Sequence, residues 1–416
     1  MAEFTEYMTR DLPAGLRLVE GGVTAAPGFR AGSTYSGIKS DVGTPDLAIL
    51  VADVPCVAAG TFTTSKTASH TVHLCKEHLA AANLHAQAVV VNSGNANCSN
   101  GRQGYQDAKR MTELTAQKFG IPAELVLVSS TGIIGRLLPM EKVEQGIAAV
   151  VPNEQGGTDF AQGILTTDTR QKTVAVEFEI GDKTVRLGGS TKGAGMIYPN
   201  MATMLCYITT NIAVNPQFLQ RELRAAVADS FNMVCIDGDM STNDTVLLLA
   251  NGLAGNEPLR DGVTGADTFS TALRYVTRYL AREIARDGEG ATRLMTVQVR
   301  GAATEADAKA AARAITASPL WQCAVAGGDP NWGRIVAALG ASGADLRHDV
   351  LELWLGDVQI MHGGVGTDYD QEAAKEAMAG KEVRVTVDLH IGNAEATAWG
   401  CDLTHGYIDE NTLYTR

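Results

Sequence analysis

Residues 188–211 read GGSTKGAGMIYPNMATMLCYITTN, and this stretch holds the strongest indication of both fold and chemistry in the chain. A glycine-rich loop leads into Pro199-Asn200, and a small residue, Ala202, is followed by a hydroxyl residue, Thr203. The apolar run from Met204 to Ile208 is typical of a strand. This order is what an N-terminal nucleophile needs.

The chemical reason lies in the weakness of a threonine hydroxyl as a nucleophile. Its reactivity requires a base within hydrogen-bond reach, and an N-terminal threonine supplies its own α-amine. A glycine-flanked turn would let the Thr203 hydroxyl attack the Ala202 carbonyl and so free that amine. The spacing alone also fits an ordinary glycine-rich loop before a strand. A phosphate-binding loop is disfavoured, because GxxxxGK[ST] is absent from this stretch.

Composition narrows the function classes. The chain has 416 residues, 45% hydrophobic and 19% charged, with a formal net charge of −13 and no Lys/Arg-rich block. These values favour a globular protein acting on small molecules over a binder of nucleic acid or anionic membranes. The polar, acidic N-terminus does not resemble a signal peptide, and no apolar run approaches the roughly 20 residues that span a bilayer. We expect a cytoplasmic protein of two lobes, with Pro152–Asp159 as the best candidate boundary.

Two residue groups could suggest a metal site. The seven cysteines are far apart, form no CxxC pair, and are interpreted as buried small hydrophobes. Asp237, Asp239, Asn243 and Asp244 form an acidic cluster, but the later Glu of an EF-hand is missing. A structural turn is the preferred interpretation of this cluster, and no metal is expected.

Strand-like and helical patterns alternate along the chain, which predicts a mixed α and β class. The predicted strands are Leu47–Val54, Ala88–Val91 and Val174–Ile180. The predicted helices are Asp107–Phe119, Glu141–Val151, Gln217–Val227 and Phe269–Ile284.

The string from Lys192 to Leu205 closely resembles the cleavage-site signature of the ornithine acetyltransferases, which transfer acetyl from N-acetylornithine to glutamate. Further segments resemble that family in order between about residues 14 and 410. They include AAGTFTT (58–64), VNSGNAN (91–97), SSTGIIG (129–135), LTTDT (165–169), IDGDMSTNDT (236–245), DGEGAT (287–292), GDPNWGR (328–334) and TAWGCDLT (397–404).

The resemblance implies a fold and an assembly. The fold would be the α/β/β/α sandwich of DmpA-like self-processing hydrolases, an N-terminal-nucleophile type of enzyme. Cleavage between Ala202 and Thr203 would give an α chain of residues 1–202 and a β chain of residues 203–416, which co-fold and pair as an α2β2 heterotetramer. The chemistry needs no metal or organic cofactor. Whether acetyl-CoA serves as a second acetyl donor stays open.

The resemblance also implies roles for individual residues. Thr203 would be the nucleophile and acetyl carrier, and Thr131 with Gly132 would form the oxyanion hole. A glycine admits a carbonyl close to the backbone, while a hydroxyl adds a second donor. Without the family, residues 130–132 would be interpreted as an ordinary strand-ending turn.

Thr166, Lys192 and Glu289 match substrate-binding or catalytic positions of the family. An ammonium at Lys192 could bind a substrate carboxylate or keep the Thr203 α-amine neutral. Glu289, in a Gly-Glu-Gly turn, could bind a substrate ammonium or assist proton transfer. By themselves both charges would be interpreted as solvated surface groups.

The C-terminus departs from the family pattern. Family members tend to end with an asparagine five positions before a terminal hydroxyl residue, both near the substrate. Asn411 fits, but position 416 is Arg416, and Thr415 stands one place early. The motif at 328–334 is interpreted as a rigid loop near the site, with Asn331 and Arg334 as candidate contacts.

Two rival functions remain on the sequence alone. A self-processing amidase or aminopeptidase would use the same nucleophile, with water in place of glutamate. A non-catalytic binding protein would keep the fold uncut, and the intact nucleophile motif argues against it.

Overall fold

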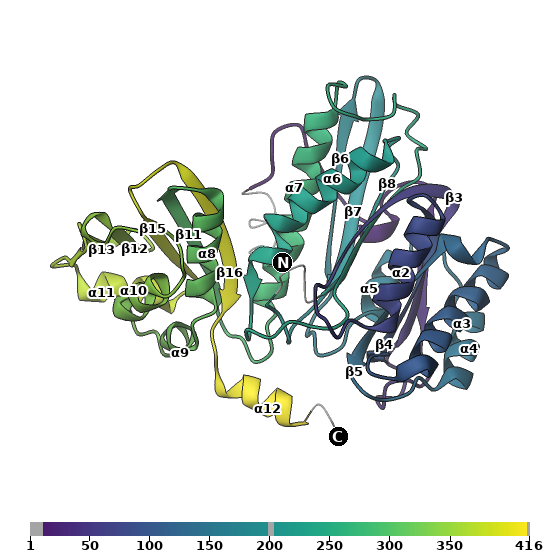
Figure 1. The fold of residues 1–416 in the computed structure, drawn as a ribbon, viewed down its shortest axis with the longest axis horizontal. Helices are drawn as coiled ribbons and strands as arrows, with labels where there is room; N and C mark the ends of the chain where they lie inside the picture. Colours follow the sequence, from purple (N-terminus) through teal and green to yellow (C-terminus); the bar gives the residue numbers. More distant parts are fainter. Residues whose placement is uncertain (1–10, 199–203, 414–416) are drawn as a thin grey trace. The chain divides into compact units, whose positions relative to one another are not determined.

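The computed structural model describes residues 11–198 and 204–413 (Figure 1). It divides into two compact units. The first comprises Met1–Gly193, Asn200–Ala228 and Met240–Leu280, and the second comprises Ala194–Pro199, Asp229–Asp239 and Ala281–Arg416. Neither unit is one continuous stretch of chain, so long-range contacts, and not a linker, set the boundaries.

The expected boundary at Pro152–Asp159 is wrong, because this segment lies inside the first unit. The backbones of Ala31 and Asn153 exchange two hydrogen bonds, of 3.0 and 2.9 Å. A glycine-dense, polar segment can therefore be fixed against a strand that is remote in the sequence. Its composition alone does not predict that contact.

The first unit is built on one sheet. Its strands are β1 (Arg17–Val19), β2 (Phe29–Thr34), β3 (Leu47–Phe62), β4 (His85–Asn95), β5 (Val126–Ile133), β6 (Lys172–Ile180), β7 (Lys183–Lys192), β8 (Leu205–Thr210) and β10 (Thr245–Ala250). They follow the order β1-β6-β7-β8-β10-β3-β4-β5, with β2 paired to β3. Strand β8 is antiparallel to β7 and parallel to β10.

Helices accompany this sheet along the chain. They are α2 (His70–Ala81), α3 (Gly101–Phe119), α4 (Met140–Ala149), α5 (Gly157–Gly163), α6 (Pro216–Ala228) and α7 (Ala266–Arg286), with short 3-10 turns at Gly22–Thr24 and Ala123–Leu125. Helices α2 and α3 contact β5, α6 contacts β3, and α5 contacts β2. Helix α2 begins where the Ser69 side chain accepts a hydrogen bond from the Thr71 N–H, which satisfies one of the unpaired N–H groups of its first turn.

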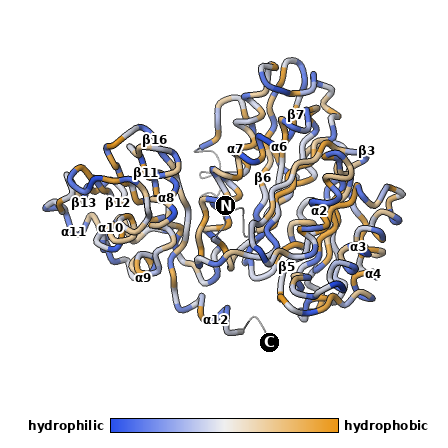
Figure 2. Tube along the Cα trace, viewed as in Figure 1, coloured by the Kyte–Doolittle hydropathy of each residue, from blue (hydrophilic) through white to orange (hydrophobic). Residues whose placement is uncertain are grey.

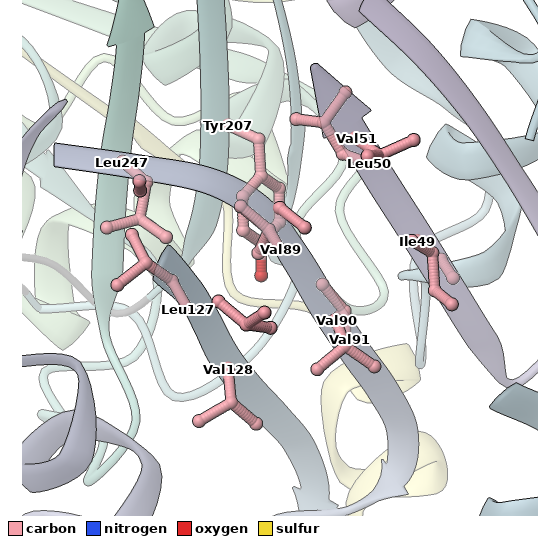
Figure 3. Packing of buried hydrophobic residues seen from close by; sticks show 14 of the residues in the cluster. Ile49, Leu50, Val51, Val89, Val90, Val91, Leu127, Val128, Tyr207 and Leu247 are labelled. Atoms are coloured by element: carbon pink, nitrogen blue, oxygen red, sulfur yellow. The ribbon is translucent and has the colours of Figure 1, made fainter. Parts of the chain in front are cut away.

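The core of the first unit explains why its central strands are so apolar. Figure 3 shows side chains of β3, β4 and β5 meeting Tyr207 of β8 and Leu247 of β10. The Tyr207 ring lies edge-on to Phe160 of α5, with ring centroids 5.2 Å apart. Central strands covered on both faces read as near-continuous hydrophobic runs, and much of β3 is orange in Figure 2.

The second unit has a smaller sheet in the order β14-β13-β12-β15-β11-β16-β9. Its strands are β9 (Val234–Cys235), β11 (Leu294–Ala302), β12 (Glu352–Leu355), β13 (Val358–His362), β14 (Val365–Gly366), β15 (Glu382–Asp388) and β16 (Ala394–Cys401). Its helices are α8 (Glu305–Thr316), α9 (Pro319–Gly327), α10 (Trp332–Gly340), α11 (Gln371–Ala379) and α12 (His405–Leu413), with 3-10 turns at Phe231–Met233 and His348–Val350. Helix α8 packs on β11 and β16.

The mixed α and β class is confirmed by these two sheets and their helices. Each predicted strand and helix corresponds to an observed one, and the predicted run after Thr203 is β8. Within residues 11–198 and 204–413, no helix has the length and apolar character to cross a bilayer.

We expect Leu247→Ala to lower the free energy of unfolding by about 2–5 kcal/mol, because the removed atoms leave a cavity in a core that cannot fully collapse. Leu247 is 0% exposed, whereas Leu253, just beyond the same strand, is 51% exposed. Leu253→Ala is the matched control, with an expected change within about 0.5 kcal/mol. Hydrogen exchange of peptides from β8 and β10 measures the effect on this sheet directly, and equal protection in both variants would contradict the assignment of Leu247 to the core.

Candidate active site

Thr131 and Gly132 lie at the end of β5, where this strand runs parallel to β4. Gly132 pairs with Gly94 and has φ of 130°, in the region that favours glycine. A Cβ atom at Gly132 would lie 2.3 Å from the Gly94 carbonyl carbon and 2.5 Å from the Asn95 nitrogen. Only glycine therefore permits this close approach of the two strand ends.

Buried amide side chains hold the same strand end. Asn243 is 5% exposed, and its Nδ2 donates to the carbonyl oxygens of Ala96 at 2.6 Å and Ser130 at 2.7 Å. The Ser130 hydroxyl donates to Asn92 Oδ1 at 2.6 Å. Because these amide and hydroxyl groups pair with the backbone and with one another, the backbone that carries Thr131 is fixed from several sides.

Lys192, the last residue of β7, meets Thr131. Its Nζ donates a hydrogen bond to Thr131 Oγ1 at 3.3 Å, and the residue is only 8% exposed. An ammonium has donors alone, so the Thr131 oxygen must accept. The hydroxyl hydrogen of Thr131 remains available to a second acceptor, and donation from a cation strengthens it as a donor. The structure thus brings two sequence-predicted site residues together.

The Asp168 side chain, in the loop before β6, joins the segments around this contact. It is fully buried and accepts hydrogen bonds from Lys172 Nζ at 2.6 Å, from the Gly193 N–H at 2.7 Å and from the Thr166 N–H at 3.1 Å. Burial raises the pKa of the Asp168 carboxyl, but the charges of Lys172 and Lys192 outweigh it and hold the pKa well below its usual range. Thr166 is thus placed beside the site through its backbone.

A third lysine, Lys39, belongs to the same region. The buried Asp46 carboxylate accepts the N–H groups of residues 36–39, which fixes the loop that carries Lys39. Burial lowers the pKa of Lys39 to about 8; the charge of Lys192 adds to this, while Asp46 and Asp168 oppose it. Lys39, Lys172 and Lys192 share this region with the carboxylates of Asp168, Asp46 and Asp41, so their positive charges are largely balanced.

Glu289 and Asn411 are brought together in the second unit. Asn411 Nδ2, on α12, donates to Glu289 Oε2 at 2.7 Å. The Glu289 N–H donates to the Ala194 carbonyl at 2.8 Å. A Cβ atom at Gly195 would lie 2.3 Å from the Glu289 carboxyl carbon, so the absence of a side chain there makes room for the carboxylate.

The acidic cluster is a structural element. Asp237 accepts backbone N–H groups of Met196, Ile197 and Asp239, and Asn243 binds two carbonyl groups in the first unit. The preferred interpretation from the sequence, a structural turn, is confirmed for these two residues. Among the described residues, no group of three His, Cys, Asp or Glu is placed to hold a metal ion.

The other sequence-predicted residues fall into two classes. Ala202, Thr203, Thr415 and Arg416 lie outside the described residues. Asn331 and Arg334 make local bonds around the turn between α9 and α10: Asn331 Nδ2 donates to Asp329 Oδ2 at 3.2 Å, and Arg334 donates to the Leu320 carbonyl at 2.6 Å.

Sequence reasoning missed Asp168, Lys172 and Lys39 as site residues. Asp168 stands in the family-like segment LTTDT, which is the one signal that pointed to it. Lys172 and Lys39 stand outside every segment singled out. Their proximity to Lys192 arises from the pairing of β6 with β7 and from the Asp46 loop, and neither is visible as a spacing along the chain.

Comparison of the sequence with known proteins shows the family to which the chain belongs. Residues 30–416 match the model of the ArgJ family. The chain is 50% identical over 397 residues to the arginine biosynthesis bifunctional protein ArgJ of Symbiobacterium thermophilum, covering 95% of this chain and 98% of that protein. The chain belongs to the ArgJ family.

Two further likenesses extend this result. The chain is 44% identical over 414 residues to a glutamate N-acetyltransferase of Methanocaldococcus jannaschii, covering 96% of this chain and all of that one. A crystal structure of ornithine acetyltransferase complexed with ornithine, from Mycobacterium tuberculosis, is 37% identical; the match covers 45% of this chain and 100% of that one, with a TM-score of 0.42. By its family and by the two relatives from Symbiobacterium thermophilum and Methanocaldococcus jannaschii, this ArgJ-family chain is an enzyme, an acyltransferase of arginine biosynthesis.

We expect Asp168→Asn to destabilise this ArgJ-family chain by about 3–5 kcal/mol, because the Lys172 ammonium is left buried without its carboxylate. The double variant Asp168→Asn/Lys172→Met should lose less than the single variant, since it removes both charges. Urea unfolding of the three proteins at pH 7 tests this order, and a double variant as unstable as the single one would contradict the ion pair's role.

The same variants test the pH dependence. The folded-state pKa of Asp168 is depressed, so its stabilising contribution is present above about pH 4, the usual value for an unfolded aspartate, and is lost as the pH falls further. Unfolding measured between pH 3 and 7 should show a steeper acid loss in the wild type than in the double variant.

Proposed function

We propose that this chain transfers an acetyl group from N2-acetyl-L-ornithine to L-glutamate through an acetyl ester on Thr203. The observation that carries the proposal is the contact of Lys192 with Thr131 beside Gly132, in a chain of the ArgJ family. It combines a hydroxyl polarised by a cation with a neighbouring position restricted to glycine. Relatives named as glutamate N-acetyltransferase and ornithine acetyltransferase support the choice of substrates.

The first step of the proposal is self-cleavage between Ala202 and Thr203. The Thr203 hydroxyl attacks the Ala202 carbonyl carbon, the C–N bond breaks, and the acyl group moves from nitrogen to oxygen. Water then hydrolyses the ester, which leaves a carboxylate on Ala202 and a free α-amine on Thr203. This amine is a base of suitable strength near neutral pH. Support comes from the sequence around the bond and from Met204, which leads directly into the central strand β8.

Two acyl transfers follow. The Thr203 hydroxyl attacks the acetyl carbonyl of N-acetylornithine and gives its proton to the α-amine, and the departing amine of ornithine takes a proton as the C–N bond breaks. The glutamate amine then attacks the acetyl ester and regenerates the hydroxyl. In both tetrahedral intermediates the Thr131 hydroxyl and the Gly132 N–H donate to the negative oxygen.

The charged residues have separate roles in this proposal. Both substrates carry an α-carboxylate, and Lys192 provides a cation for this common group. The side-chain ends differ in sign, ammonium in ornithine and carboxylate in glutamate. Glu289, with Asn411 as its hydrogen-bond donor, suits the ornithine ammonium or a proton-transfer role. No cofactor takes part, and the name "bifunctional" of several relatives makes acetyl-CoA the second donor to test.

Purified protein incubated with N-acetylornithine labelled in the acetyl group distinguishes this function from its rival. With glutamate present, we expect the label on glutamate; a self-processing amidase would release it as acetate whether or not glutamate is added. Replacing N-acetylornithine by acetyl-CoA in the same assay tests the second donor. Size-exclusion chromatography with light scattering tests the proposed α2β2 assembly.

We expect wild-type protein to give two bands of similar size on a denaturing gel, because the proposed cut lies near the middle of the chain. Thr203→Ala should give one full-length band and no transferase activity, since the attacking oxygen is missing. Thr203→Ser keeps a hydroxyl and should still cleave. An uncut wild-type protein that transfers acetyl groups would rule out Thr203 as an N-terminal nucleophile.

We expect Thr131→Ala to lower kcat by about 10²-fold, because an oxyanion donor acts mainly in the transition state. Thr131→Val, of nearly the same shape, should lose as much, whereas Thr131→Ser should keep most of the activity. Steady-state kinetics of the cleaved proteins measures this. A rise in KM with unchanged kcat would make Thr131 a substrate contact instead.

A further inference from the structure

The described chain immediately before the proposed cut has an unusual course. Residues 194–198 belong to the second unit, whereas the stretch that ends at Gly193 belongs to the first. Within this segment Met196 has φ of 54°, in the left-handed region that residues with a side chain rarely adopt. The Met196 side chain is 42% exposed, so core packing does not impose this conformation.

One carboxylate holds the backbone at this point. Asp237 Oδ2 accepts the Met196 N–H at 2.5 Å, and Asp237 Oδ1 accepts the Ile197 N–H at 2.9 Å. The Ile236 N–H donates to the Ile197 carbonyl at 2.7 Å. Two consecutive N–H groups can point at one carboxylate only if the chain turns between them, so Asp237 selects the left-handed conformation of Met196.

Further contacts fix both sides of the turn. The Glu289 N–H binds the Ala194 carbonyl at 2.8 Å, and the Arg313 guanidinium lies 4.7 Å from the centre of the Tyr198 ring. The Ile197 side chain is 1% exposed. On the other side of the interval 199–203, the Met204 carbonyl accepts the Thr245 N–H at 2.9 Å, in the first unit. The described residues on each side of the proposed cut are therefore anchored.

Asp237 has no role in the acyl transfers proposed above, yet it is partly buried. Besides the two N–H groups of the segment, it accepts the Asp239 N–H at 3.1 Å and the Tyr407 hydroxyl at 3.3 Å. Burying a carboxylate is costly unless it is well hydrogen-bonded. Most of its hydrogen bonds go to backbone N–H groups, which indicates that it orders the course of the chain.

We infer that Asp237 is a positioning residue for self-cleavage: it fixes residues 196 and 197, and with them the point from which the chain leads to the Ala202–Thr203 bond. The inference rests on the proposed cut at that bond. An intramolecular attack needs its oxygen and carbonyl carbon held near contact distance. Loss of the anchor before the bond allows the chain many unproductive arrangements, so cleavage slows although the attacking hydroxyl is intact.

Cell-free synthesis followed by a chase and a denaturing gel measures the first-order rate of cleavage. In Asp237→Asn, one of the two oxygens that accept the Met196 and Ile197 N–H groups is replaced by an NH2 group, which cannot accept. We expect this variant to slow cleavage by about 10-fold or more. Asp239→Asn is the matched control, because Asp239 is exposed and only its backbone takes part in the turn; its rate should equal the wild-type rate.

Two variants at Met196 distinguish positioning from a general loss of folding. Met196→Ile keeps Asp237 but disfavours the left-handed conformation through its β-branch, so it should also slow cleavage, whereas unbranched Met196→Leu should not. In the Asp237→Asn background, Met196→Gly should restore part of the rate, because glycine adopts positive φ without help.

The outcomes separate the inference from the function on which it rests. If the wild type cleaves and Asp237→Asn and Met196→Ile both cleave at its rate, Asp237 has no positioning role and the proposed function stands. If Asp237→Asn is slow but Met196→Gly restores nothing and Met196→Ile is fast, the effect is structural and the inference fails. A wild-type chain that is never cut overturns both.

Discussion

The buried Asp168 carboxylate is the interaction on which the candidate site depends. The Lys172 ammonium and the backbone N–H groups of Gly193 and Thr166 bind it, and the charge of Lys192 also acts on it. Its bond to the Gly193 N–H fixes the end of β7, and therefore the position of Lys192. Lys192 in turn binds Thr131. The Lys192 ammonium is thus held in place through a buried carboxylate of the protein itself.

The chemistry of the strand ends follows from backbone geometry as much as from side chains. Thr131 and Gly132 lie where the parallel pair β4 and β5 converge, and the closeness of Gly94 to Gly132 leaves no space for a side chain. Asn243 closes the same region by donating to the carbonyl groups of Ala96 and Ser130. A residue predicted as part of a turn therefore supports the geometry of a candidate oxyanion hole.

Much of the fold could be predicted from the sequence, because the central strands are apolar runs and the helices are amphipathic. The prediction was least complete where a pattern breaks: the strand expected at Leu47–Val54 continues to Phe62 through an irregular pairing after Val51. The start of α3 at Gly101 was missed because its first turn is rich in glycine and polar residues. The motifs of the family pointed to Thr131 and Lys192, which the structure brings into contact. Asp168, Lys172 and Lys39 were not recognised as site residues, since burial of a charge depends on partners remote in sequence.

The strand order of the first unit has a thermodynamic consequence for a chain cut between residues 202 and 203. Strands β8 and β10 would belong to the second fragment, yet they lie between β7 and β3 of the first. Each fragment would expose the hydrophobic edges and faces that the other covers, so neither has a complete core of its own. Cutting would change folding from a unimolecular to a bimolecular reaction, whose equilibrium depends on concentration. A cut molecule would persist for as long as its unfolding is slow. Once separated, the two fragments would have to meet again before either could fold.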